Sequence, residues 1–152
     1  MVRCTVTSDV TGVIVATCLA VPMLALPLAA QPMKQAADWS GTWSGRYVCA
    51  QGATGLALTI QRGEANAVTA RFSFYPLPEN PQAEAGQFMM RGRVDAADPD
   101  RLHLVAGRWL QRPEGYVTVD LDGRFNSESG EYRGRVGGPG CSGFVLRRDP
   151  LG

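Results

Sequence analysis

The sequence predicts an all-β domain, a small antiparallel meander that closes into a roughly eight-stranded barrel. From Trp43 onward, apolar residues recur at every second position in short runs, which is the period of a strand and not of a helix. The 152 residues include 18 glycines and 10 prolines, and each of these costs about 1 to 3 kcal/mol inside a helix. No helical segment is long enough to connect parallel strands, so neighbouring strands should be antiparallel.

The expected strands follow one another along the chain, each with an apolar and a polar face. They cover residues 43–49, 56–60, 68–74, 88–94, 102–104, 117–121, 132–136 and 144–146. The turn signals between them are Arg62-Gly63-Glu64, Asp98-Pro99-Asp100, Asp122-Gly123 and Gly137-Gly138-Pro139-Gly140. Such near-regular spacing of short strands is typical of a barrel or a β-sandwich.

A barrel is favoured over the alternative, a β-sandwich, because closing the sheet removes its exposed edges. A closed sheet of about eight strands has room for its own side chains or for one small ligand. The bulky apolar residues on the expected inner faces are Phe72, Phe74, Phe88, Met90 and Phe144. We therefore expect a solid core and not a wide ligand cavity.

The amino end carries a candidate export signal. Residues 10–30 contain no charge, Pro22 and Pro27 interrupt the apolar run, and Leu28-Ala29-Ala30 offers small residues for cleavage. We expect residues 1–30 to be a signal peptide, with an uncleaved membrane anchor as the alternative. Residues 31–38 are then a flexible lead, and residues 39–149 a single β domain with no membrane span after cleavage, located in the periplasm or outside the cell.

Export makes the cysteines informative. Cys4 and Cys18 lie in the segment that would be removed, which leaves Cys49 near the start of the domain and Cys141 near its end. Two cysteines in an exported domain predict one disulfide, Cys49–Cys141, holding the first strand near the last. A redox or metal-binding pair would need a Cys-x-x-Cys spacing or histidine partners, and neither is present.

The sequence offers little catalytic chemistry. His103 is the only histidine and is expected on the outward face of a strand, and there is no Gly-x-Ser-x-Gly motif to partner it. We expect no enzymatic activity, no cofactor and no metal. The alternative is a hydrolase acting on glycan through a carboxylate pair, Asp120 with Glu114 or Asp122. The acidic turn Asp95, Asp98 and Asp100 is interpreted as a solvated turn and not a calcium loop.

Binding is the favoured function, and it is expected in two long connections, residues 75–86 and 107–115. The second contains Arg108 and Arg112 around Trp109, with Tyr116 nearby, and Trp and Arg are common at binding hot spots. These four residues are the candidate binding site, with Trp109 the preferred contact. The balance of 15 Lys and Arg against 14 Asp and Glu argues against a nucleic-acid partner.

We therefore expect an exported, non-enzymatic domain that binds a protein or a cell-envelope component. An inhibitor of a secreted hydrolase is one form of this hypothesis, and a structural envelope protein is a further alternative. The identity of the ligand and the oligomeric state do not follow from the sequence.

Ser40-Gly41-Thr42-Trp43 resembles the Gly-x-Trp that opens lipocalin-like barrels and some small exported bacterial protease inhibitors. The resemblance implies an up-and-down barrel in which Trp43 plugs one end, with binding at the open end or by the amino-terminal segment. It covers four residues, and the rest of the lipocalin pattern is missing, so we assign no family from it.

Overall fold

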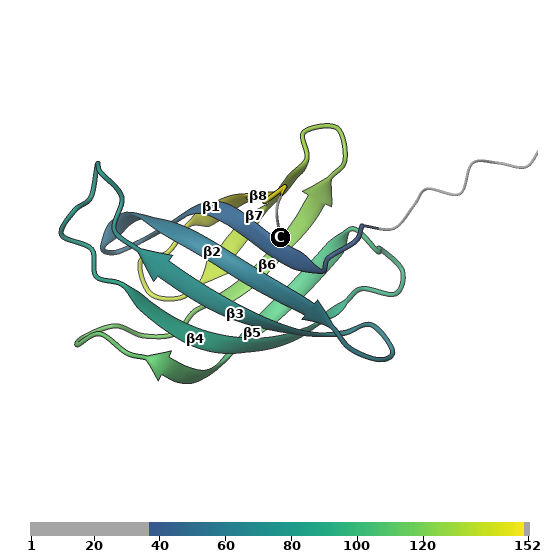
Figure 1. Ribbon diagram of the computed structural model, residues 1–152, viewed down its shortest axis with the longest axis horizontal. Coiled ribbons are helices and arrows are strands. Elements are labelled where there is room, and N and C mark those ends of the chain that lie inside the picture. Colours follow the sequence, from purple (N-terminus) through teal and green to yellow (C-terminus); the bar gives the residue numbers. More distant parts are fainter. Residues whose placement is uncertain (1–36, 151–152) are drawn as a thin grey trace, which may run out of the picture. The chain divides into compact units, whose positions relative to one another are not determined.

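A computed structural model describes residues 37–150, which form one closed antiparallel barrel (Figure 1). Its strands are β1 (Gly41–Cys49), β2 (Gly52–Arg62), β3 (Ala67–Tyr75), β4 (Gly86–Val94), β5 (Arg101–Gln111), β6 (Asp120–Asn126), β7 (Glu131–Gly137) and β8 (Gly143–Arg148). Each strand pairs with the next, and β8 returns to pair with β1. The predicted all-β barrel is confirmed over the sandwich, while the predicted signal peptide and residues 31–36 of the lead lie outside the described residues.

The barrel interior follows from the alternation of side chains along each strand. Trp43, Tyr47 and Cys49 point inward from β1, and the register of β1 with β8 sets Tyr47 opposite Phe144. Phe72, Phe88 and Met90 are fully buried in the middle of the barrel, and a pocket remains at one end. A fully buried large apolar side chain contributes about 1.5 to 3 kcal/mol, which makes this interior the main source of stability.

The connections between strands fall at two ends. We call one the disulfide end, formed by residues 50–51, 76–85, 112–119 and 138–142, which lies at the left in Figure 1. The other, the Trp39 end, is formed by residues 37–40, 63–66, 95–100 and 127–130. Because consecutive strands alternate in direction, both of the long connections singled out in the sequence lie at the disulfide end.

The Trp39 end is closed by aromatic rings. Trp39 is fully buried, packs against Trp43 and Tyr132, and donates from Nε1 to the carbonyl of Pro99 at 3.0 Å. Trp43 therefore lies where the resemblance implied a plug. Ala37 is also buried and Asp38 pairs with Arg148, so these two residues of the predicted lead contact the barrel.

The strands are longer than or shifted from the predicted ranges, and two of these differences change where candidate residues lie. The sixth strand covers Asp120–Asn126 and not 117–121, so Asp122-Gly123 lies inside a strand and is not a turn. A Cβ on Gly123 would come within 3 Å of the rings of Phe144 and Tyr132, so this glycine makes room for the core. The fifth strand continues to Gln111, which places Arg108 and Trp109 in a strand instead of a loop.

Candidate functional site

A β-bulge in β5 determines where Trp109 points. Along β4, Phe88 and Met90 are two residues apart, yet their partners on β5, Trp109 and Ala106, are three apart. The extra residue reverses the alternation of inward and outward side chains along β5. Before the bulge the even-numbered residues point inward, and after it the odd-numbered Trp109 does. Gly107 permits the bulge, because a Cβ there would lie 2.9 Å from the Met89 carbonyl oxygen.

The disulfide end contains a pocket of about 350 Å³. Most of its lining is aromatic or aliphatic: Tyr47, Phe72, Phe74, Phe88, Tyr116, Val117 and Val119, with Pro139 and the disulfide on one side. None of the described residues that line it is charged, and Gln51 supplies the only amide side chain. The volume lies near the lower limit of small-molecule sites, so the pocket fits one small apolar group.

Hydrogen bonds tie the rim of this pocket together. The side-chain amide of Asn80 donates to the carbonyl oxygens of Gln51 and Ala53 at 2.7 and 2.9 Å, which fastens the β3–β4 connection to the β1–β2 turn. The backbone amide of Glu84 donates to the Tyr116 hydroxyl at 3.0 Å, which fastens it to the β5–β6 connection. Three connections are thus linked before any ligand binds, which reduces the entropy lost on binding.

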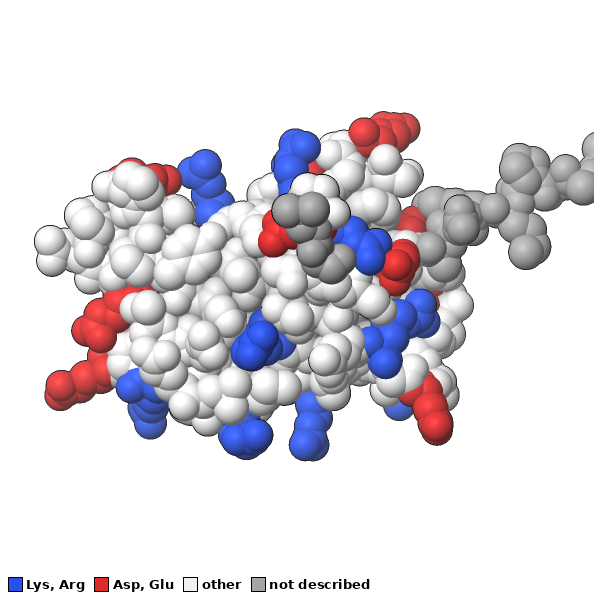
Figure 2. Space-filling view, viewed as in Figure 1, with Lys and Arg blue, Asp and Glu red and all other residues white. Residues whose placement is uncertain are grey.

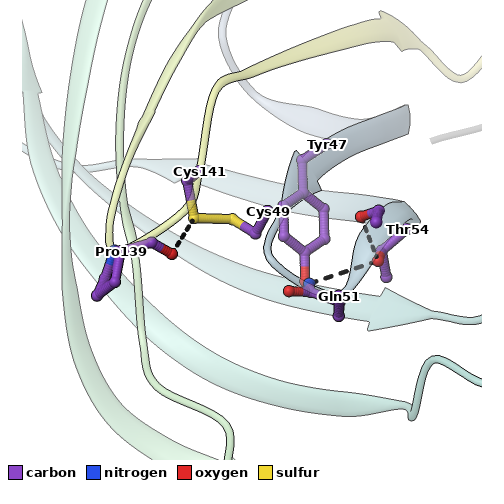
Figure 3. Close-up of a disulfide and its surroundings, with 7 residues drawn as sticks. Tyr47, Cys49, Gln51, Thr54, Pro139 and Cys141 are labelled. Atoms are coloured by element: carbon purple, nitrogen blue, oxygen red, sulfur yellow. Dashed lines mark hydrogen bonds between the residues drawn. A yellow bond between two sulfur atoms is a disulfide. The ribbon is translucent and has the colours of Figure 1, made fainter.

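The disulfide forms one wall of the pocket (Figure 3). Cys49 ends β1 and Cys141 lies between β7 and β8, so the bond reinforces the closing seam of the barrel. Next to it, the amide of Ser142 donates to the Val48 carbonyl at 2.9 Å. The predicted Cys49–Cys141 pairing is confirmed, and it lies beside the pocket.

Tyr47 reaches across the pocket from β1. Its hydroxyl accepts a hydrogen bond of 2.9 Å from the Gln51 side-chain amide, as Figure 3 shows. Burial raises the pKa of the Tyr47 phenol well above its usual range, with the nearby Tyr116 adding to the shift. The phenol is therefore neutral at physiological pH and adds no charge to the pocket.

The structure brings three of the four predicted binding residues together. Tyr116 lines the pocket, and Trp109 packs edge-on against Phe74 and Phe88, which also line it. The Arg112 guanidinium lies over the Trp109 ring, 5.9 Å from its centroid, and donates from Nε to the Tyr116 carbonyl at 3.3 Å.

Arg108 is separate from this group. It lies in the bulge on the outer wall, beside Arg71 and Leu110.

The residues considered for catalysis have structural partners or lie exposed on the surface. The Asp120 carboxylate accepts a 2.7 Å hydrogen bond from the Ala106 amide, and Asp122 pairs with Arg101 at 2.8 Å. Arg101 lowers the pKa of Asp122, and this carboxyl is therefore ionised and fixed by its ion pair with Arg101. His103 is exposed, on the outer face of β5, where it was expected. Glu114 is exposed on the β5–β6 connection.

The acidic turn is held by its own hydrogen bonds. Asp95 accepts from the amides of Ala97 and Asp98, and Asp98 pairs with Arg124 at 2.9 Å. Within residues 37–150, no cluster of three His, Cys, Asp or Glu side chains is placed to hold a metal ion.

The aromatic lining was not recognised in the sequence as a site. Phe72, Phe74 and Phe88 were expected to fill the interior, and Tyr47 was one of several inward residues of its strand. Their position near the strand ends that face the long connections was the available signal. Side chains at that level border the space below the connections, so they can line a pocket.

Comparisons of the chain with family models, with curated proteins and with solved structures find no match. No helix in the described part of the chain is long and apolar enough to cross a membrane.

Proposed function

We propose that the protein is an exported, non-enzymatic binding domain whose aromatic pocket takes an uncharged apolar group of a protein or cell-envelope partner. The pocket of about 350 Å³ carries this proposal, because its lining offers apolar contact and almost no polar or charged group. The buried part of the ligand should match the size of an aromatic side chain or a short acyl chain.

The surroundings of the pocket suit a larger partner bearing that group. Arg112, Glu84 and Glu114 are exposed on the connections around the mouth and can contact the rest of the partner. An apolar anchor in a pocket surrounded by polar contacts is the usual arrangement of a binding hot spot. An inhibitor that inserts one side chain of a secreted hydrolase is one form of this function.

Calorimetry with uncharged probes tests the pocket directly. The wild-type protein should bind p-cresol, indole or 1-octanol, and Val117→Trp, which places a large ring at the mouth, should weaken binding at least about tenfold. Val48→Trp is the matched control, because Val48 is also exposed but lies on the outer face of β1, away from the pocket. Binding that is absent in the wild type, or unchanged in Val117→Trp, would contradict the proposal.

Partner capture from envelope extract tests the biological role with the same variants. Trp109→Ala and Arg112→Ala should reduce recovery of a partner that Val48→Trp still recovers. Equal recovery by the wild type, the two test variants and the control would show that Trp109 and Arg112 do not contribute to the binding surface. Asp120→Asn should leave recovery unchanged, whereas loss of a glycan-hydrolysing activity in this variant would support the enzyme alternative.

A further inference from the structure

The charges of the barrel wall are unevenly distributed. Strands β2 to β5 contain no aspartate or glutamate, yet they carry six arginines: Arg62, Arg71, Arg91, Arg93, Arg101 and Arg108. In Figure 2, arginine side chains project along the lower margin of the barrel, where Figure 1 places β3 and β4. The near-zero net charge of the whole chain conceals this basic side.

Four of these arginines have no partner among the described residues. Among residues 37–150, the guanidinium groups of Arg71, Arg91, Arg93 and Arg108 make no hydrogen bond or ion pair. Elsewhere on the barrel most arginines are paired, as in Arg124 with Asp98 and Arg147 with Glu131. An external anion would therefore not have to compete with a carboxylate of residues 37–150.

Strand register sets two of these arginines beside apolar residues of the neighbouring strand. Arg91 is opposite Val105 across β4 and β5, and Arg71 is opposite Met89 across β3 and β4. Val105 is 47% exposed and Leu110 is 43% exposed, high fractions for apolar residues on a strand. We call the outward side chains of β3, β4 and β5 the basic wall.

The basic wall also contains a hollow of about 330 Å³. Arg71 and Arg108 both line it, together with Thr59, Thr69, Met89 and Leu110. Two guanidinium groups and two hydroxyls are donors that match the oxygens of a phosphate group. The bulge in β5 creates this arrangement, because it directs Arg108 outward while Trp109 points into the barrel.

We propose that the basic wall docks on an anionic lipid surface, with a lipid phosphate in the hollow between Arg71 and Arg108. Guanidinium groups bind the phosphates, while Val105 and Leu110 enter the apolar layer beneath the headgroups. A lipid surface is favoured over an acidic protein because the wall is convex and lipid headgroups can move to each arginine. It is favoured over nucleic acid because no aromatic ring lines the hollow to stack on a base.

Vesicle co-sedimentation tests the proposal with the purified full chain. The wild type should bind vesicles of phosphatidylglycerol mixed with phosphatidylcholine and not vesicles of phosphatidylcholine alone. Arg71→Gln with Arg108→Gln should weaken binding roughly 30-fold, the effect expected for two cations at an anionic surface. Val105→Ser with Leu110→Ser should also weaken it, and more so at high salt, where the charges are screened.

The matched control is Arg133→Gln with Arg135→Gln, which removes the same charge from β7, four strands away from β3. All variants share one amino end, so differences between them report on the wall alone. Equal weakening by the two arginine pairs, or wild-type binding no stronger with phosphatidylglycerol, would overturn the proposal. Release of the protein from vesicles by polyglutamate or by inorganic phosphate, at constant ionic strength, would assign the wall to an acidic protein or to a free anion instead.

Discussion

The Tyr116 ring stacks on the Phe74 ring, with centroids 5.4 Å apart and planes 13° apart. This contact joins the β5–β6 connection to the end of β3 and forms one side of the pocket. The Tyr116 hydroxyl extends the link to the Glu84 amide. The Tyr116 side chain thus links two connections through residues that are 32 apart in the chain.

Tyr116→Phe should keep the stack and lose the hydrogen bond. We expect a loss of about 0.5 to 1.5 kcal/mol in the free energy of unfolding, and faster hydrogen exchange at the Glu84 amide. Tyr116→Ala should also remove the stack on Phe74, and it should weaken the binding of apolar probes to the pocket. Tyr75→Phe, which alters an exposed tyrosine on the outer face of β3, should change neither measurement. Unchanged exchange at Glu84 in Tyr116→Phe would contradict the contact.

Replacing both Cys49 and Cys141 by serine should cost about 4 to 5 kcal/mol, because the bond joins residues 92 apart and restricts the unfolded chain. Urea unfolding of the variant, compared with the wild type under oxidising and reducing conditions, measures this loss. The reduced wild type should resemble the serine variant. A loss below about 1 kcal/mol would show that the rest of the β1–β8 seam is sufficient.

Trp39 precedes the first strand, yet it should be essential to the closed end of the barrel. Trp39→Ala should lower the free energy of unfolding by about 3 to 5 kcal/mol, because a fully buried ring leaves a cavity. Trp39→Phe keeps much of the packing but loses the hydrogen bond to Pro99, so it should cost less. Thermal and urea unfolding measure both. Wild-type stability in Trp39→Ala would show that the domain begins at β1.

The ion pair of Asp122 with Arg101 should make stability depend on pH. Hydrogen bonding to Arg101 lowers the pKa of Asp122 in the folded protein. The pair therefore contributes fully above the pKa of the unfolded carboxyl, about 4. That contribution is lost as the pH falls through the lower folded pKa. The melting temperatures of the wild type and Asp122→Asn should differ near neutral pH and converge as the pH falls through the folded pKa of Asp122, whereas a constant difference would exclude this linkage.

The fold could be predicted from the sequence because its determinants are local. Period-two runs and turn residues specify strands, and the two cysteines of the predicted domain, Cys49 and Cys141, left one pairing to predict. The turn predicted at Asp122-Gly123 was wrong, because whether this pair forms a turn or continues a strand depends on residues distant in the sequence. In the barrel the space beside that glycine holds the rings of Tyr132 and Phe144.

The candidate site could be predicted only in part, for a similar reason. The sequence indicated Trp109, Arg112 and Tyr116, but it placed Arg108 with them. Which of Arg108 and Trp109 faces inward depends on the bulge, and a bulge is defined by pairing with another strand. The pocket depends on where several strands end relative to one another, which no single run of residues specifies.

The bulge itself can be tested through Gly107. Gly107→Ala places a Cβ 2.9 Å from the Met89 carbonyl oxygen, so the backbone of β5 must shift. We expect a loss of about 1 to 3 kcal/mol in the free energy of unfolding and a change in Trp109 fluorescence. Apolar probes should also bind to the pocket more weakly. Gly137→Ala is the control, because its Cβ would meet its nearest neighbour at 3.4 Å, an ordinary contact. If Gly107→Ala matched this control in all three measurements, the bulge would not be what positions Trp109, and the pocket would owe its shape to the connections alone.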